Sequence, residues 1–319
     1  MLTLLKLLKD GRFHSGQALG AALGISRSAV WKQLQHLEAD LDLSIHKVRG
    51  RGYQLATPLT LLDPAEIASQ ARACIWPVMV FDSIDSTNAQ ALRSIDKGVV
   101  APFIVLAERQ TAGRGRRGRK WASPFAENIY YSLVLRIDGG MRQLEGLSLV
   151  VGLAVMQTLR ESGVRGAGLK WPNDVLVGQK KIAGILLELV GDPADVCHVV
   201  LGVGVNVNMQ ATEEVDQQWT SMRLESGNTF DRNHLVASLG MMLQRYLNRH
   251  QESGFAAIQA EWEQNHLWQG CAVSLIAGVN QIDGIVMGID RQGGLRLKVG
   301  NVEKVFNGGE LSLRLRNDS

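Results

Sequence analysis

Cysteine is scarce in this 319-residue chain, and no part of the chain is apolar for long. The three cysteines, Cys74, Cys197 and Cys271, are far apart and show no Cys-x-x-Cys or Cys/His ligand spacing. Their odd number and spacing exclude a disulfide framework and a structural zinc site, and they predict buried thiols in a reducing compartment. No apolar run approaches the ~18 residues that span a bilayer, so we expect no membrane partner.

A secretory signal is also missing. The start, MLTLLKLLKD, is interrupted by lysines and lacks a small-residue cleavage site, so we expect a cytoplasmic protein. With 45% hydrophobic and 20% charged residues, the chain has the composition of a soluble globular protein of two or three domains. The net charge of +3 indicates little by itself, but residues 1–60 hold eight Lys or Arg against four Asp or Glu.

This basic N-terminal segment has the pattern of three short helices. Apolar spacing and capping residues predict one helix at 2–9, a second that ends at a turn at Gly24, and a third from an N-cap at Ser26 to about Glu38. The apolar residues of the third helix share one face: Val30, Leu34 and Leu37. The opposite face is polar and carries no acid: Ser28, Lys32 and Gln35, with Arg27 and Trp31 on the flank.

A predicted hairpin, Ser44–Leu55, follows, and its tip RGRG is basic. Helix, turn and helix before a basic wing indicate a winged helix-turn-helix, with the third helix in a DNA groove and the wing on phosphate. The residues expected to contact DNA are Ser26, Arg27, Ser28, Lys32, Arg49 and Arg51. The alternative interpretation is a module for protein interaction or dimerisation.

The rest of the chain divides at changes of pattern. A proline-bracketed linker, TPLTLLDP, predicts a boundary near residue 63. Beyond it, short strands accompany helices at 143–161, 231–250 and 255–265, and five glycine-punctuated strands follow Trp268. The predicted fold class is α+β: an N-terminal winged helix-turn-helix at 1–62, a central mixed or antiparallel sheet with helices at 63–267, and a C-terminal SH3-like β-barrel at 268–319.

The central segment contains an Arg-Gly loop, GRGRRGRK at 113–120, with five positive charges and no acid. Glycines at 113, 115 and 118 permit positive φ and close backbone approach, and guanidinium groups donate bidentate hydrogen bonds to phosphate. The loop joins predicted strands at 103–111 and 128–137, as a functional lid would. The alternative is a solvated, disordered or nonspecific nucleic-acid-binding run. We expect a lid that is mobile when the site is empty.

Four further motifs carry polar chemistry. DSTN at 85–88 offers short donors and acceptors and also an N-cap for a helix at 89–95. KWPND at 170–174 places a cation and a carboxylate around a turn, and it could also be a plain structural turn. KKIAG at 180–184 offers Lys181 to a carboxylate or phosphate, with a solvated hairpin lysine as the alternative. GVNVN places Asn206 and Asn208 at the end of a buried strand.

Taken in order, these motifs resemble those of the bifunctional biotin ligases that are also biotin operon repressors. The resemblance covers essentially the whole chain, from the winged helix to GGELSLR at 308–314, and the ordered set is highly specific. It implies a class II synthetase-like central domain and a two-step reaction. Biotin and ATP give biotinyl-5'-AMP and pyrophosphate, and a lysine of a biotin carboxyl carrier protein then accepts the biotinyl group.

The resemblance also assigns roles to residues. It implies biotin contacts from Ser86, Thr87, Asn88, Gln110, Gly113, Arg114, Gly115, Arg116, Lys181 and Gly184. It implies ATP or adenylate contacts from Arg116, Arg119, Trp121, Asn173, Lys181, Asn206 and Arg314, with Trp121 stacked on adenine. The residues expected to be catalytic are Arg116, Lys170, Asp174 and Lys181.

Further partners follow from the same resemblance. Mg²⁺ is expected as a cofactor because two anions must meet at the α-phosphate, although its ligands cannot be assigned from the sequence. Adenylate binding is expected to favour a homodimer that binds operator DNA, with the carrier protein competing for the sheet edge at 185–190. A second loop, 209–219, matches the family's adenylate-ordered loop by position but departs from it in its acidic TEEVD.

Two other functions remain open at this stage. One is a lipoate-type ligase on a related catalytic fold, although the Arg-Gly loop together with KWPND favours biotin. The other is a transcription factor that senses a small acid through a catalytically silent central domain. Biotin-dependent release of pyrophosphate from ATP distinguishes the ligase from the sensor.

The DNA-binding hypothesis generates a first prediction. Combining Lys32→Ala with Arg49→Ala should weaken binding to promoter DNA of the biotin synthesis genes and lower the slope of log affinity against log salt by about 0.9 per lost phosphate contact. Titrating a labelled duplex at several salt concentrations measures both. An affinity that is insensitive to salt and unchanged in the double variant would contradict DNA binding by this face.

Overall fold

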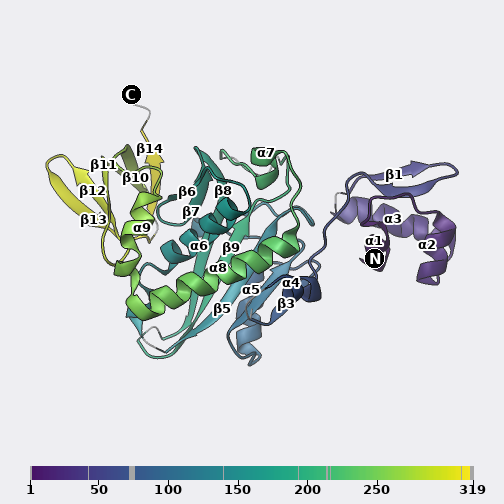
Figure 1. Ribbon diagram of the computed structural model, residues 1–319, viewed down its shortest axis with the longest axis horizontal. Coiled ribbons are helices and arrows are strands. Elements are labelled where there is room, and N and C mark those ends of the chain that lie inside the picture. Colours follow the sequence, from purple (N-terminus) through teal and green to yellow (C-terminus); the bar gives the residue numbers. More distant parts are fainter. Residues whose placement is uncertain are drawn as a thin grey trace.

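The computed structural model describes residues 2–41, 43–71, 76–138, 140–192, 194–212, 215, 217–309 and 311–316. The chain runs from an N-terminal unit through a large central sheet to a small C-terminal sheet (Figure 1). No helix within these ranges is long and apolar enough to cross a membrane. Cys197 is buried as predicted and Cys271 is only partly buried, whereas Cys74 lies outside the described residues.

The N-terminal unit is a helix-turn-helix followed by a hairpin, as predicted. Its elements are α1 (Leu2–Leu8), α2 (Gly16–Leu23), α3 (Arg27–Leu41), β1 (Ile45–Val48) and β2 (Gly52–Leu55). Helix α2 ends at Gly24, whose φ of 65° suits glycine, and the turn leads directly to the Ser26 cap of α3. The predicted apolar face of α3 is fully buried against α1, and Phe125 and Ala126 of the central unit join the same cluster.

The central unit is a seven-stranded mixed sheet with strand order β3-β4-β5-β9-β8-β7-β6. Only β3 and β4 are parallel. The strands are β3 (Val78–Phe81), β4 (Phe103–Ala107), β5 (Ile129–Ile137), β6 (Ala167–Lys170), β7 (Asp174–Val177), β8 (Lys180–Gly191) and β9 (Cys197–Val205). The longest strands, β5, β8 and β9, lie at its centre, so the sheet is mainly antiparallel, as predicted.

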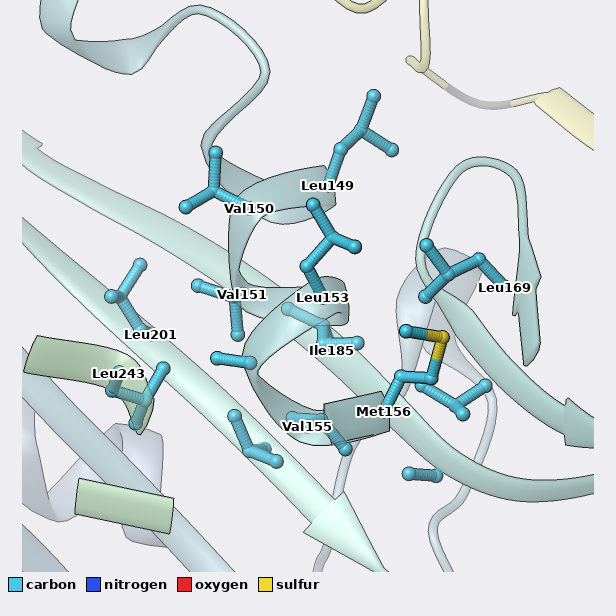
Figure 2. Packing of buried hydrophobic residues seen from close by; sticks show 14 of the residues in the cluster. Leu149, Val150, Val151, Leu153, Val155, Met156, Leu169, Ile185, Leu201 and Leu243 are labelled. Atoms are coloured by element: carbon cyan, nitrogen blue, oxygen red, sulfur yellow. The ribbon is translucent and has the colours of Figure 1, made fainter. Parts of the chain in front are cut away.

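Helices cover the two faces of this sheet unequally. Helices α6 (Leu147–Glu161) and α8 (Arg232–Ser253) cover one face, and Figure 2 shows side chains of α6 among Ile185, Leu201 and Leu243. Each such aliphatic side chain contributes about 1.5–3 kcal/mol when fully buried. On the other face, α5 (Thr87–Asp96) packs over only β4, β5 and β9. Loops cover the part of that face near β7 and β8.

Several helices differ from the sequence predictions. The helix expected at 143–161 begins at Leu147, because Gly146 takes a φ of 62° and separates α6 from a 3₁₀ turn, η2 (Met141–Leu144). The helix expected at 255–265 is divided into η3 (Phe255–Ala257) and α9 (Gln259–Gln264). The sequence analysis missed two short helices, α4 (Pro64–Gln70) and α7 (Met222–Ser226), although Asp63 and Ser221 cap them.

The C-terminal unit is a five-stranded antiparallel sheet with strand order β13-β12-β11-β10-β14. Its strands are β10 (Ala272–Ala277), β11 (Asn280–Ile289), β12 (Leu295–Val299), β13 (Val302–Phe306) and β14 (Leu311–Leu315). The recorded pairings leave β13 and β14 at the two ends, so they describe a sheet rather than a closed barrel. Apolar residues of this sheet, such as Val273 and Leu313, belong to the same buried cluster as the central unit.

A buried ion pair attaches the linker to the central unit. Arg232 donates to Glu108 at 2.6 Å, and both side chains are almost completely excluded from solvent. The other Glu108 oxygen accepts from Leu62 N at 2.5 Å, and Arg232 also donates to the carbonyl oxygens of Thr60 and Asn128. The linker between the N-terminal and central units is therefore held by charges that have no access to water.

Replacing Glu108 tests how much the fold depends on this pair. Glu108→Gln should lower the free energy of unfolding by about 3–5 kcal/mol, because it leaves the Arg232 charge buried without its counter-ion. Urea denaturation followed by circular dichroism measures the change. Glu303→Gln is the matched control, because its pair with Arg296 is open to solvent and should contribute little. Equal losses in the two variants would contradict this account.

Candidate functional site

A cavity of about 410 Å³ occupies the part of the sheet face that α5 leaves open. Its floor comes from β8 and β9, where Gly184 pairs with Gly204 and Leu186 pairs with Gly202 on one face. A Cβ atom at Gly204 would lie 2.4 Å from the Trp121 ring, and one at Gly202 would lie 2.4 Å from Asn88 Oδ1. The missing side chains therefore create the space in which Trp121 and Asn88 lie against the sheet.

The Arg-Gly loop folds over this floor as a tight, irregular hairpin. Trp121 N donates to Gly113 O at 2.9 Å and Gly115 N donates to Arg119 O at 2.7 Å, around a 3₁₀ turn, η1 (Arg116–Gly118). Of the three glycines expected to take positive φ, only Gly118 does, with φ of 69°. The other residue of the loop in the left-handed region is Arg117, with φ of 59°. Gly113 is needed for close approach instead, since its Cβ would lie 2.7 Å from Trp121 O.

Arg116 connects the loop to two distant parts of the chain. Its guanidinium donates to Asn173 Oδ1 at 3.0 Å and to the carbonyl oxygens of Gly308, Gly309 and Leu311. Burial lowers the pKa of Arg116, although the nearby Asp174 carboxylate opposes that effect. The arginine thus closes one end of the cavity against the C-terminal sheet, and its charge faces the remaining charged groups of the site.

Those groups are two lysines around one carboxylate. Asp174 lies 2.5 Å from Lys181 Nζ and 3.5 Å from Lys170 Nζ, and all three side chains are less than one-fifth exposed. Burial acts to raise the pKa of Asp174, but the two lysines outweigh it and hold the pKa below its ordinary value. Burial also lowers the pKa of Lys170, against the attraction of Asp174. Two lysine side chains surround one carboxylate in this cluster, which suits an anionic ligand.

The KWPND turn that carries this cluster is fixed from several sides. Asn173 Nδ2 donates to Ile185 O at 2.7 Å, Trp171 Nε1 donates to Gly293 O at 3.0 Å, and Ser148 Oγ donates to Pro172 O at 3.2 Å. Behind it, burial lowers the pKa of His266 to about 4, so a neutral imidazole accepts from Trp171 N. The turn is therefore held rigidly and also lines the cavity, so the structural and functional interpretations both apply.

The DSTN motif both caps α5 and lines the cavity, as predicted. Ser86 Oγ accepts from Ala89 N at 3.5 Å, and Thr87 donates to Gln110 Oε1 from its backbone at 2.8 Å and its hydroxyl at 3.1 Å. Gln110 Nε2 donates in turn to Ser123 Oγ at 3.2 Å. Because Ser123 donates to Trp121 O at 3.0 Å, a continuous hydrogen-bonded path joins this motif to the end of the Arg-Gly loop.

Nearly all of the residues predicted to be catalytic or to bind biotin or ATP line this one cavity. They are Ser86, Thr87, Asn88, Gln110, Arg114, Gly115, Arg116, Arg119, Trp121, Lys170, Asn173, Asp174, Lys181, Gly184 and Asn206. Gly113 lies just behind the lining. Arg314 is not among the residues that line the cavity, although Leu313 and Ser312, which lies on the same face of β14 as Arg314, both are. Its contact with the nucleotide stays a prediction.

The 209–219 loop, which was expected to be ordered by the adenylate, contributes residues to the cavity lining. Trp219 at its end forms a bridge with Lys181, and Asn206 Nδ2 donates to the adjacent Thr220 O at 2.9 Å. The acids that make the 209–219 loop atypical, Glu213, Glu214 and Asp216, lie outside the described residues.

The residues predicted to contact DNA are all exposed on the N-terminal unit: Ser26, Arg27, Ser28, Lys32, Arg49 and Arg51. Ser26 Oγ caps α3 by accepting from Ala29 N at 3.2 Å. Arg51, in the turn between β1 and β2, lies 4.2 Å from the centre of the Phe13 ring, so the tip of the wing contacts the segment between α1 and α2. A basic face of α3 and a basic wing are thus presented to solvent together.

Comparison with known proteins agrees with this geometry. Residues 80–206 match the model of the Biotin/lipoate A/B protein ligase family, and residues 1–54 match that of the HTH domain. The chain is 42% identical to the bifunctional ligase/repressor BirA of Salmonella typhimurium, over 98% of this chain and 97% of that one. It is 30% identical to BirA of Bacillus subtilis over 92% of each chain.

A solved structure gives the same result. The biotin protein ligase of Aquifex aeolicus, in complex with biotin and ATP, is 31% identical and superposes with a TM-score of 0.67, covering 75% of this chain and 99% of that one. The match to full-length ligase/repressors includes both the cavity and the helix-turn-helix. The chain therefore belongs to the family of bifunctional biotin protein ligases and transcriptional repressors.

Proposed function

We propose that this protein is an ATP-dependent biotin ligase that also binds DNA as a repressor of the biotin synthesis genes. The observation that carries the ligase assignment is the cluster of Lys170, Asp174 and Lys181 beside Arg116, over a glycine floor that leaves room for a flat ligand. Biotin would lie between the DSTN motif and Arg114, and the nucleotide between Trp121 and Asn173. The DNA-binding assignment is supported by the exposed basic face of α3.

In the first step an oxygen of the biotin carboxylate attacks the α-phosphorus of ATP. The bond from that phosphorus to the bridging oxygen breaks, and pyrophosphate leaves. Both reactants are anions, so the cations of the cavity bring them together. Lys181 bridges the carboxyl and the phosphate, and Arg116 and Arg119 neutralise phosphate charge, each such donor contributing about 3–4 kcal/mol of transition-state stabilisation.

In the second step a carrier lysine amine attacks the acyl carbon of biotinyl-5'-AMP. The bond from that carbon to the phosphate oxygen breaks, AMP leaves, and the amine loses a proton. Asp174 orients the incoming amine, because its pKa, held low by Lys181 and Lys170, keeps it an acceptor. The Arg-Gly loop covers the mixed anhydride and excludes water, which would otherwise hydrolyse it.

Magnesium is included in the proposal without protein ligands. Among the described residues that line the cavity, Asp174 is the only carboxylate, and two lysines already neutralise it. The described part of the chain also shows no group of three or more His, Cys, Asp or Glu side chains placed to hold a metal ion. These residues do not fit a protein-bound Mg²⁺, so phosphate oxygens and water are its expected ligands.

The finer assignments extend from the same site. The residues of β8 after Gly184 pair with β9 on one side and are not paired with β7 on the other. Residues 186–191 therefore have one open strand edge. Such an edge favours pairing with another strand. We propose that this edge pairs with a second copy in the adenylate-bound homodimer and that the biotin carboxyl carrier protein competes for it.

The domain division at 63 and 268, the SH3-like and synthetase-like folds and a cytoplasmic location also remain proposals.

Pyrophosphate release tests the ligase function directly. The purified protein with ATP and Mg²⁺ should release pyrophosphate when biotin is added and not when lipoate is added, because the site is proposed to recognise the biotin ring system. A coupled pyrophosphatase assay measures the rate. Release with lipoate alone would favour the lipoate-type ligase, and biotin binding without release would favour a small-acid sensor.

Asp174 is expected to act in the transfer step. Asp174→Asn should slow transfer of biotin from preformed biotinyl-5'-AMP to a carrier protein by about a hundredfold, because the neutral amide orients the amine less well than the carboxylate does. Single-turnover transfer with labelled adenylate measures this rate. Asp138→Asn removes an exposed pair with Arg136 and serves as the control. An unchanged transfer rate in Asp174→Asn would remove Asp174 from this role.

A further inference from the structure

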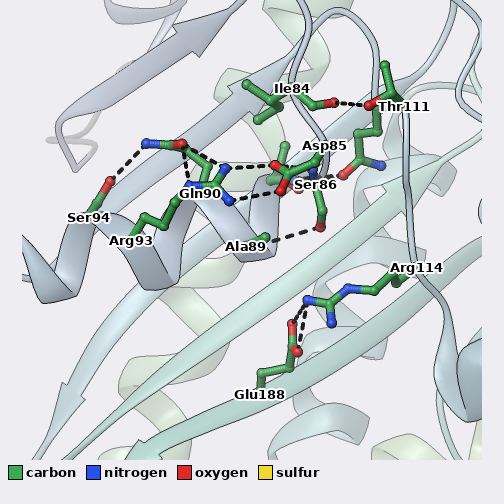
Figure 3. A network of polar contacts seen from close by, with 12 residues as sticks. Ile84, Asp85, Ser86, Ala89, Gln90, Arg93, Ser94, Thr111, Arg114 and Glu188 are labelled. Carbon is green, nitrogen blue, oxygen red and sulfur yellow. Dashed lines mark hydrogen bonds and ion pairs between the residues drawn. The ribbon is translucent and has the colours of Figure 1, made fainter.

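Glu188 of β8 is an acidic group next to the cavity that no part of the mechanism above uses. It lies two positions beyond Leu186 on the same face of the strand as the cavity floor. One of its oxygens accepts from Asn88 Nδ2 at 2.7 Å, and Arg114 Nη2 lies 3.2 Å and 3.4 Å from the two oxygens. Figure 3 shows Glu188 and Arg114 facing each other across the sheet edge.

These contacts restrain two parts of the site at once. Asn88 is buried, its Oδ1 accepts from Ser132 Oγ at 2.6 Å, and Glu188 holds the other end of the same amide. The amide is therefore clamped between β5 and β8, directly over Gly202. Arg114 is the first cation of the Arg-Gly loop, and its guanidinium is drawn toward β8 by the same carboxylate.

As a consequence, Arg114 and Arg116 of the loop differ in whether their charge is available to a ligand. The positive charge of Arg114 is neutralised by Glu188, whereas Arg116 donates, among the described residues, to amide and carbonyl oxygens, which leave its charge available to an anion. Glu188 also joins the first turn of α5 to the start of the loop, which are the two sides of the cavity proposed to hold biotin. It touches none of Lys170, Asp174 and Lys181.

We propose that Glu188 is a positioning residue for biotin: it holds Arg114 and Asn88 in the arrangement that binds the acid. The inference rests on the proposed function, because it takes Asn88 and Arg114 as biotin contacts. Since Glu188 acts on the biotin end of the cavity and not on the reacting atoms, its loss should change the affinity for biotin and leave the chemical step intact.

The first experiment compares Glu188→Gln with wild type. The glutamine oxygen still accepts from Asn88 but lacks the charge that attracts Arg114. Titration calorimetry without ATP should show biotin binding weakened by roughly fivefold, the range of a half-exposed ion pair. The kcat of pyrophosphate release and the KM for ATP should stay within about twofold of wild type. Glu188→Asp, which keeps the charge, should recover part of the biotin affinity.

Glu303→Gln is the matched control, because it removes a similarly exposed Glu–Arg pair far from the cavity. If Glu188 had only a structural role, Glu188→Gln would have a lower thermal unfolding midpoint but the same dissociation constant for biotin. That result would overturn the proposal. So would an equal change in the KM for ATP, since it would place Glu188 on the whole site and not on its biotin end.

A double-mutant cycle isolates the link to Arg114. Glu188→Gln should weaken biotin binding less in the Arg114→Gln background than in wild type, because the charge that Glu188 positions is already absent. The full effect in both backgrounds would overturn the positioning role. If wild type itself bound no biotin, the proposed function would fail. If wild type and Glu188→Gln bound biotin with the same affinity, the proposed function would stand and only this inference would fail.

Discussion

The site depends on a constraint of the central sheet, which is that only half of one face is covered by a helix. A sheet in a soluble domain must bury its apolar faces, and α6 and α8 do so completely on one side. On the other side α5 stops short, and Gly184, Gly202 and Gly204 replace the apolar side chains that would otherwise need cover. The resulting hollow is closed by a loop rich in cations, which makes it a site for an anionic ligand instead of a core.

The charges around this hollow are arranged so that burial does not neutralise them. Asp174 would be unstable as a buried carboxylate alone, but two lysines compensate it and leave a net positive charge. Arg116 is half-buried, and the carbonyl oxygens that accept from its N–H groups do not cancel its charge. Arg114, by contrast, has a carboxylate partner in Glu188. Two arginines two positions apart in the Arg-Gly loop therefore have different electrostatic surroundings.

The three units of the chain meet close to this site. Glu108 and Gln110 are two positions apart: the first holds the linker through Arg232, and the second accepts hydrogen bonds from Thr87 inside the cavity. Arg109 between them donates to Asp40 O at the end of α3. At the opposite end of the cavity, Arg116 reaches the C-terminal sheet. Each unit is thus connected to the substrate cavity by a short run of hydrogen bonds.

The sequence by itself determined the features that depend on neighbours in the chain. Periodicity located α3 and the long strands, Ser86 and Ser26 marked helix starts, and the ordered motifs identified the ligase and its cavity residues. What it could not determine were contacts between residues far apart in the chain. Glu188 shows no motif, and its role appears only when β8 lies beside α5 and the Arg-Gly loop.

The tertiary structure also decided which side chains from distant parts of the chain reach the cavity, which the composition does not determine. Leu313 of the C-terminal sheet lines the cavity, and Trp219 joins it through a bridge with Lys181. Likewise, Glu108 and Arg232 are ordinary charged residues in the sequence and become a buried pair only in the folded chain. The physical reason is that local patterns reflect backbone periodicity and capping, whereas ion pairs and cavity linings depend on which strands and loops the fold brings together.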